Sequence, residues 1–297
     1  MKQKQRLSGG MLFDWFNVVL MAVLCFVCVV PVIHVICASF SDPRQLLSNT
    51  GLLLAPLGFT TVGYSLIFSN SAIVTGYFNT IFYVVAGTAL STVLTIMGGY
   101  ALSRRNLYWS RFIMLMITFT MFFSGGLIPF YLLVNELGLL NTRLAVILPS
   151  AVNAFNLIIM RTSMSGVPES LEESAVIDSA PPVVIMVRIV VPLCSATVAV
   201  IVLFYAVGIW NSWFNASIFL NDRKLYPLQL ILKEILVASD TSAVLNTSTD
   251  TTGKNMDIYK PLVKYCTIVA ATLPVLCFYP FVQKYFVTGM LIGSIKG

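Results

Sequence analysis

The chain has 297 residues, of which 58% are hydrophobic and only 10% are charged. Soluble globular proteins contain about 25% charged residues, so this composition excludes a soluble domain and indicates an integral membrane protein. The net charge of +6 comes from basic residues that stand singly or in pairs between apolar segments. Such scattered charges do not form the basic stripe typical of nucleic-acid binding, and they fit the loops between membrane spans better.

Six apolar segments are long enough to cross a membrane as helices. They lie near residues 15–38, 76–102, 111–134, 144–165, 193–220 and 264–287. The first segment exceeds the length of a signal-peptide core and lacks a convincing cleavage site, so we expect it to be retained as a span. The sequence thus predicts an all-α integral membrane protein, with residues 1–14 as an N-terminal extension and residues 15–297 as one six-span domain.

The distribution of basic residues predicts the orientation of these spans. Six spans place both termini on the same side of the membrane. With that side cytoplasmic, ten basic residues lie inside, including Arg104, Arg105 and Arg111 between the second and third spans, and eight lie outside in much longer loops. The positive-inside rule therefore favours cytoplasmic termini.

Two spans contain features that could line a path through the membrane. Residues 122–129 combine two glycines and a proline in an apolar segment, which indicates either a packing kink or a break beside a cavity. Asn211 and Asn215 are four residues apart, so on a helix they would share one face. Nearby Trp210 fits either that path or an interfacial aromatic belt. The candidate path residues are Asn79, Tyr83, Asn153, Asn156, Tyr205, Trp210, Asn211 and Asn215.

Reactive side chains do not converge in this sequence. The single histidine, His34, has no acidic neighbour in its apolar segment, which favours a packed polar residue over a proton relay. The polar outer loop, residues 221–262, contains Gly253-Lys254, but Ser248 and Asn255 replace the glycine and hydroxyl residue of a phosphate-binding loop. We expect no catalytic residue, metal site or cofactor in this chain.

The loop of residues 167–192, between the fourth and fifth spans, concentrates four of the twelve acidic residues. Pro168 and the acidic residues after it suit the start of a helix, and Pro181-Pro182 suits its end. Leu171, Ala175 and Ala180 provide an apolar face on this short helix. It is either a solvated loop or a helix that docks in a partner's groove.

The same loop resembles the EAA loop of ABC-importer permeases, which reads E-A-A-x3-G-x9-I-x-L-P. Glu173-Ser174-Ala175, Ser179, Ile189 and Val191-Pro192 keep its spacing, with serine at the glycine position. In that family the loop forms a coupling helix that docks on a cytoplasmic ATPase. The resemblance implies a docking set of Glu169, Leu171, Glu172, Glu173, Ser174, Ala175, Asp178, Ser179 and Ala180.

Further segments resemble the maltose-permease type of carbohydrate importer, and in particular its oligosaccharide-importing branch. They include residues 283–287 near the C-terminus, 122–129 and 205–215. The resemblance implies a type I ABC-importer permease in a bacterial cytoplasmic membrane, which moves a sugar by alternating access. It also implies three kinds of partner: a second homologous permease in a heterodimer, two ATPase subunits that bind ATP and magnesium, and an external solute-binding protein. A secondary transporter is the alternative, although it would need ionisable groups within the spans.

Overall fold

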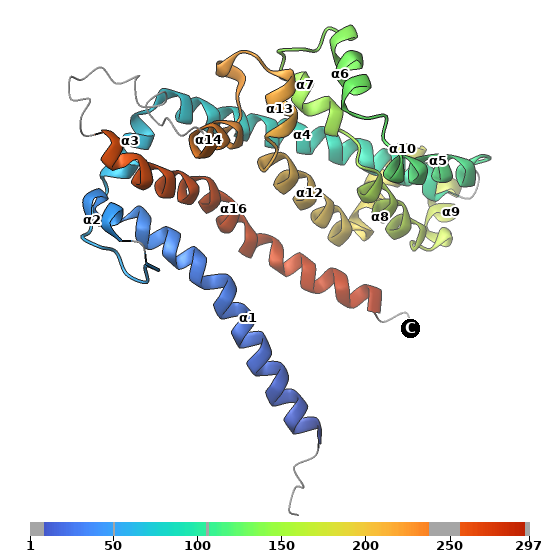
Figure 1. The fold of residues 1–297 in the computed structure, drawn as a ribbon. Coiled ribbons are helices and arrows are strands. Elements are labelled where there is room, and N and C mark those ends of the chain that lie inside the picture. Colours follow the sequence, from blue (N-terminus) through green and yellow to red (C-terminus); the bar gives the residue numbers. More distant parts are fainter. Residues whose placement is uncertain (1–8, 50, 105–106, 238–255, 295–297) are drawn as a thin grey trace, which may run out of the picture. The chain divides into compact units, whose positions relative to one another are not determined.

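The structure is a computed structural model, and nearly all of its described residues are helical (Figure 1). It describes residues 9–49, 51–104, 107–237 and 256–294. In these ranges the only strand-like pairing is an isolated bridge between Ser41 and Phe59. The all-helical prediction is therefore confirmed. The side chains of the predicted C-terminal signature, residues 283–287, lie outside those that the structure describes, and residues 238–255 of the predicted outer loop lie outside the described residues.

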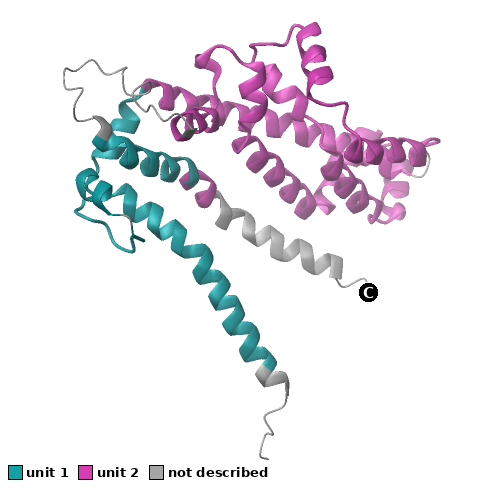
Figure 2. Cartoon of the chain, viewed as in Figure 1, with its two compact units in different colours: residues 1–70, 238–272 teal, residues 71–237, 273–297 magenta. Residues whose placement is uncertain are grey.

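Contacts divide the chain into two compact units (Figure 2). Unit 1 comprises Met1–Asn70 and Ala238–Thr272, and unit 2 comprises Ser71–Val237 and Leu273–Gly297. The described helices of unit 1 are α1 (Gly9–Ser39), α2 (Pro43–Ser48), α3 (Val62–Ser69) and the first part of α16 (Met256–Ser294).

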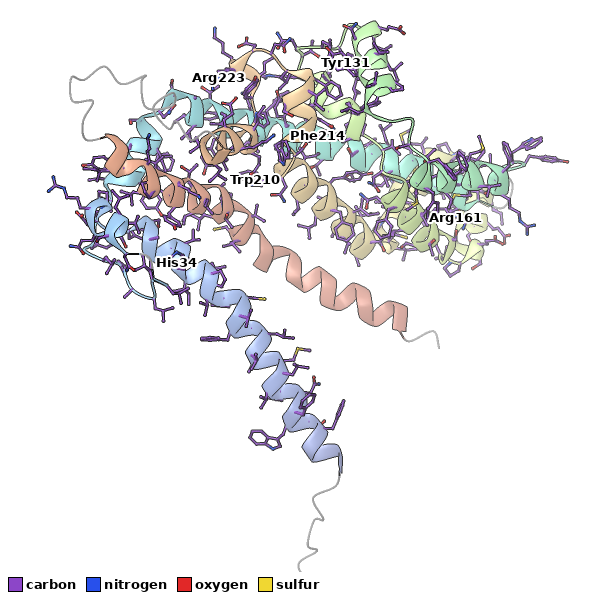
Figure 3. All side chains as sticks on the ribbon, viewed as in Figure 1. His34, Tyr131, Arg161, Trp210, Phe214 and Arg223 are labelled. Carbon is purple, nitrogen blue, oxygen red and sulfur yellow. The ribbon has the colours of Figure 1, made fainter. Side chains whose placement is uncertain are left out.

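Unit 1 contains the single histidine, on α1 (Figure 3). The Nδ1 atom of His34 accepts a hydrogen bond of 3.0 Å from the backbone N–H of Leu53, and its ring meets that of Tyr265 edge to face. This bond holds the loop after α2 against α1. His34 thus has the role of a packed polar residue that its apolar sequence context predicted.

Unit 2 is built around α4 (Ser71–Ser103), which packs against α8 (Ala154–Ser165), α12 (Ser195–Trp210) and α14 (Leu228–Val237). Its buried face is rich in glycine, serine and threonine. Lipid tails are as apolar as leucine, so membrane helices associate through close packing of small residues rather than through a hydrophobic force. At Gly99 a Cβ atom would lie only 2.6 Å from Cγ of Met160, which shows how closely α8 approaches.

Within the part of the chain that the structure describes, three helices are long and apolar enough to cross a membrane by themselves, within Phe13–Ser39, Ser71–Ser103 and Ile258–Cys277. Three further candidates are bent pairs, which raises the number to six if each pair is one span. Their bends measure 114° between α5 (Ser110–Phe122) and α6 (Leu127–Glu136), 49° between Leu144–Ser150 and α8, and 88° between Pro182–Leu193 and α12. The spans expected at 144–165 and 193–220 are therefore interrupted by breaks that the sequence did not predict, and the count of six spans stays a prediction.

The 114° bend resolves the two interpretations of residues 122–129 in favour of a break. Gly126 has φ +84° and ψ 169°, a conformation that side chains with a Cβ rarely adopt. Pro129 then lies in the first turn of α6, where its missing N–H costs no helical hydrogen bond. Glycine and proline here divide the segment into two helices rather than bend one.

Between α8 and α12 the chain forms α9 (Glu169–Ile177), α10 (Pro182–Ile185), a π-helical turn (Met186–Val190) and α11 (Val191–Leu193). Pro192 cannot donate a backbone hydrogen bond, which is one reason for the irregular turn before it. After α12 the chain forms α13 (Phe214–Phe219), a 3-10 turn η3 (Arg223–Leu225) and α14. The helix α13 packs against α7. The helix α7 itself spans Leu144–Ile147.

Candidate functional site

The helix α9 occupies the loop that the sequence singled out. It begins after Pro168, and Glu169 and Glu172 lie in its first turn, where the positive end of the helix dipole stabilises negative charge. Its nine residues make about two and a half turns at 3.6 residues per turn. A short helix of this kind needs support from the rest of the chain, since isolated helices of this length do not hold in water.

The end of α9 has the geometry of a Schellman motif, although no glycine is present. Ser179 adopts φ +60°. Its N–H donates to the carbonyl of Val176 at 2.9 Å, and the N–H of Ala180 donates to that of Ala175 at 3.0 Å. These two bonds satisfy carbonyl groups that the helix end would otherwise leave unpaired. Ser179 therefore turns the chain as a glycine would, and Pro181 and Pro182 follow in extended and helical conformations.

An ion pair fixes the first turn of α9 to the end of α4. The guanidinium of Arg104 pairs with the carboxylate of Glu172, and its second nitrogen donates to the carbonyl of Met164 at 3.1 Å. Burial lowers the pKa of Arg104 from its ordinary value, an effect that Tyr100 and Glu169 oppose. Arginine still carries its charge at neutral pH, so the pair persists there.

The inner face of α9 packs on the protein's own core. Ala175 and Ala180 contact a cluster of buried side chains that includes Met164, Val167 and Ile185. The prediction that both alanines belong to an exposed apolar face was wrong, as was the assignment of Glu172 to a free acidic surface. Sequence periodicity grouped Leu171 with these alanines, but Leu171 is exposed, and a sequence cannot tell which partner covers the alanines.

The outer face of α9 presents a different set of residues. Ile177 is 83% exposed, and Leu171 and Val176 are also exposed. Glu173 lies on the side of α9 that carries Val176 and Ile177, and it has no ion pair to any described residue. Val176 and Ile177 were missed at the sequence level, although two adjacent β-branched apolar residues in a polar loop are a usable signal of a contact surface.

A polar pocket of about 350 Å³ lies where the chain breaks before α8. Three predicted path residues, Asn153, Asn156 and Tyr205, line it together with Phe204 and Ser212. The hydroxyl of Tyr205 bonds Thr95 at 2.7 Å and accepts from the backbone N–H of Asn153 at 3.1 Å. Asn153 also caps α8 by accepting from the N–H of Asn156. The side-chain amide of Asn156 has no hydrogen bond to any described residue, so it can bind a ligand in the pocket.

Two other predicted path residues are used to hold the outer loop. Asn79 donates to the carbonyls of Lys224 at 2.7 Å and Tyr226 at 3.1 Å, and Tyr83 donates to that of Leu225 at 2.8 Å. Both side chains are almost fully buried. Neither lines the polar pocket. Their donors bond backbone carbonyls of residues 224–226, and Oδ1 of Asn79 accepts from Arg143 at 3.4 Å.

The remaining path candidates, Trp210, Asn211 and Asn215, do not act as one helical face. The helix α12 ends at Trp210, and α13 begins at Phe214, so the two asparagines lie on either side of a break. The prediction that they share a face was wrong because the 3.6-residue repeat holds only within a continuous helix. Trp210 is buried and borders an apolar cleft of about 760 Å³ (Figure 3).

Long apolar helices, one of them broken beside a polar pocket, are typical of membrane transport proteins, because irregular backbone at membrane depth is tolerated where it lines a cavity. No family model matches the chain. It is 41% identical over 286 residues to the polygalacturonan/rhamnogalacturonan transport system permease protein YtcP of Bacillus subtilis (strain 168), covering 96% of this chain and 99% of that protein. It is 38% identical to protein LplC of the same organism, over 98% and 97% of the two chains.

A solved structure shares this fold. The crystal structure of a bacterial ABC transporter involved in the import of the acidic polysaccharide alginate matches with a TM-score of 0.84 and 31% identity, over 95% of this chain and 99% of that one. The chain therefore belongs to the permease proteins of ABC sugar-import systems, as the EAA-like loop indicated. Its role is transport, and permeases of this family work with ATPase and binding-protein partners.

Proposed function

We propose that this chain is one permease subunit of an importer that carries oligosaccharides with uronic-acid residues into a bacterial cell. The observation that carries the proposal is the 41% identity to a polygalacturonan/rhamnogalacturonan permease along almost the whole chain. The likeness to a transporter for another acidic polysaccharide supports the same substrate class. A permease for neutral arabino-oligosaccharides is less similar, at 25% identity.

The proposed setting is the cytoplasmic membrane, with both termini on the cytoplasmic side. Arg104, Arg111 and Arg161 lie at the ends of α4, α5 and α8, next to α9. Basic residues collect on the cytoplasmic ends of spans, which supports placing α9 there. The loop of residues 167–192 is then the cytoplasmic coupling loop, and residues 221–262 form the outer loop that receives a solute-binding protein.

In this proposal α9 docks in a groove of an ATPase on a separate chain. ATP and magnesium bind to that ATPase, and the permease itself needs no cofactor. Leu171, Val176 and Ile177 would contribute apolar contact area, while Glu169 and Glu173 would orient the contact electrostatically. Ser174 and Asp178 are exposed at the edge of the same face. A second, homologous permease would complete the translocation path in a heterodimer.

The polar pocket is the proposed part of that path in this chain. Asn156 can donate to and accept from sugar hydroxyls, and the ring of Phe204 offers an apolar surface. The N-terminal end of α8 lies at the same break, and its dipole favours a carboxylate. These features suit a sugar that has both hydroxyl and carboxylate groups.

The proposal is tested with the transporter reconstituted in lipid vesicles with its partner subunits. Oligogalacturonides delivered by the binding protein should stimulate ATP hydrolysis and accumulate inside, and neutral arabino-oligosaccharides of the same length should do neither. Equal stimulation by both sugars would overturn the acidic substrate class. Absence of ATP-dependent uptake of any sugar would overturn the importer itself.

The pocket assignment is tested by Asn156→Ala. Loss of one hydrogen bond should lower uptake efficiency roughly two- to tenfold while ATPase assembly stays intact. Asn135→Ala, at the exposed end of α6, serves as the matched control. Unchanged uptake in the Asn156 variant would remove this pocket from the path.

A further inference from the structure

Three arginines from three different segments line one cleft at the end of unit 2. Arg104 follows α4, and Arg111 lies in the first turn of α5. Arg161, labelled in Figure 3, lies one turn before the end of α8. The cleft has a volume of about 570 Å³. We refer to the space lined by these arginines, with Tyr108, Trp109 and Phe112, as the basic cleft.

The positive charge of the basic cleft is only partly neutralised within the chain. No carboxylate of the described residues lines it. Arg104 pairs with Glu172, but Arg161 makes a single long hydrogen bond, of 3.4 Å, to the carbonyl of Leu102. Arg111 has no hydrogen bond or ion pair within the described chain. Two guanidinium groups therefore keep donors available for an anion.

The basic cleft lies where apolar segments long enough to cross a membrane end. The apolar span of α4 ends at Ser103, and the apolar helix α5 begins at Ser110, so the arginines lie within about a turn of the ends of spans. Tyr108 is 98% exposed, and Trp109 and Phe112 are exposed beside it. Tyrosine and tryptophan at such a position are typical of the headgroup region, where one part of the ring is apolar and the other is wet.

We propose that the basic cleft binds the phosphate of an anionic membrane phospholipid. Guanidinium groups donate paired hydrogen bonds to phosphate oxygens, which makes arginine well suited to this group. The exposed aromatic rings would contact the glycerol and the upper acyl chains of the same lipid, which a free phosphate ion could not use. With the orientation proposed above, this lipid belongs to the inner leaflet. The binding of the lipid does not depend on that orientation.

The lipid would lie next to the coupling helix. A neighbouring cleft of about 500 Å³ shares Arg104, Ser103 and Arg161 with the basic cleft and is bordered by Pro168 and Glu169 at the start of α9. A phosphate on Arg161 therefore fixes a side chain that also borders the base of α9. Bound lipid should reduce hydrogen exchange in α9 as well as occupy the cleft.

The test uses the full-length chain, purified in detergent and stripped of native lipid. Binding of phosphatidylglycerol and phosphatidylcholine with identical acyl chains is compared by native mass spectrometry. The wild-type chain should retain phosphatidylglycerol at least roughly tenfold more tightly, because both lipids have one phosphate but the choline cation of phosphatidylcholine cancels its net charge and is repelled by the arginines. Equal retention of both lipids would overturn the proposal, and this comparison needs no variant.

Variants locate the site. Arg111→Gln with Arg161→Gln should abolish the preference, and Arg188→Gln, an exposed arginine outside the cleft, should preserve it. An unchanged preference in the double variant would overturn the location. If the double glutamine variant fails to fold, Arg111→Lys with Arg161→Lys should show a reduced preference, because lysine keeps the charge but not the paired donors. Displacement of phosphatidylglycerol by millimolar inorganic phosphate alone would identify the ligand as free phosphate and overturn the lipid assignment.

Discussion

Replacing Glu172 by glutamine removes the negative charge from the ion pair that holds α9 against the end of α4. Glutamine keeps the shape of the side chain and one carbonyl oxygen, so the change isolates the charge. Glu173 provides a matched control, because it has the same chemistry one position further on but faces outward. We expect Glu172→Gln to loosen α9 and Glu173→Gln to leave it in place.

The magnitude follows from the burial of the pair. The side chains of Arg104 and Glu172 are 22% and 13% exposed. Exposed ion pairs contribute about 0.2–1 kcal/mol, whereas removing one partner of a fully buried pair costs about 3–5 kcal/mol. Partial exposure places the loss between these limits, at about 1–3 kcal/mol. A loss in this range raises the open population of α9 roughly 5- to 150-fold.

Hydrogen exchange of the α9 backbone amides measures this population directly, since exchange reports local opening. Amides of residues 172–178 should exchange faster in Glu172→Gln and at the wild-type rate in Glu173→Gln. In the assembled transporter, Glu172→Gln should also weaken sugar-stimulated ATP hydrolysis, because a loosely held α9 transmits less of its motion to α4. Arg104→Gln should lower the free energy of opening α9 by less in the Glu172→Gln background than in the wild-type background. The difference should exceed about 0.5 kcal/mol.

Two results would refute this reasoning. One is identical exchange of the α9 amides in the Glu172 and Glu173 variants. The other is additivity of Arg104→Gln and Glu172→Gln, which would mean that the two side chains do not interact energetically.

Two further substitutions test local geometry. Ser179→Gly should stabilise the end of α9 by about 0.5–1 kcal/mol, because serine at φ +60° carries a steric cost that glycine does not, and slower exchange at Ala180 would show it. Gly99→Ala should lower the stability of unit 2 by about 1–3 kcal/mol, because its Cβ would lie 2.6 Å from Cγ of Met160 and 3.3 Å from the backbone nitrogen of Arg161. Thermal unfolding in detergent measures the second effect.

Each of these substitutions has a control of the same chemistry. Ser174→Gly, inside α9, should destabilise the helix. If glycine stabilised the helix at Ser174 and destabilised it at Ser179, the assigned helix end would be contradicted. Gly125→Ala should leave stability unchanged, since no atom lies within 4 Å of the added Cβ. Equal losses at Gly99 and Gly125 would mean that close packing of α4 on α8 is not the cause.

The sequence predicts the helical class, the apolar segments and the position of α9, because composition and local helix signals act within a few residues. It does not predict the break before α8 or the one at Cys194 before α12, where the chain turns by 49° and 88°. Hydropathy measures how well a segment suits lipid, and it contains no information about bending. Only Gly125-Gly126 and Pro129 signalled a break by their own conformational preferences.

The candidate site was predictable to the extent that its residues act locally. Ser179 matches the position of a helix-terminating glycine, and it does end the helix. Ala175 and Glu172 were assigned outward because a sequence cannot show that Met164 and Arg104, from two other helices, meet the inner face of α9. Asn79 shows the same limit, since its partners in η3 lie about 145 residues away in the chain.

The helix α4 has a mechanical consequence. Its 33 residues form one rod about 50 Å long, at 1.5 Å per residue. Asn79 and Tyr83 near its first end are bonded to η3, and Arg104 just beyond its last residue is bonded to α9. A displacement of α9 that preserves these bonds cannot stay local, because a continuous helix transmits it lengthwise to η3. The bonds at both ends of α4 thus belong to one chain, and a displacement of α9 reaches η3 without passing through any of the three bends.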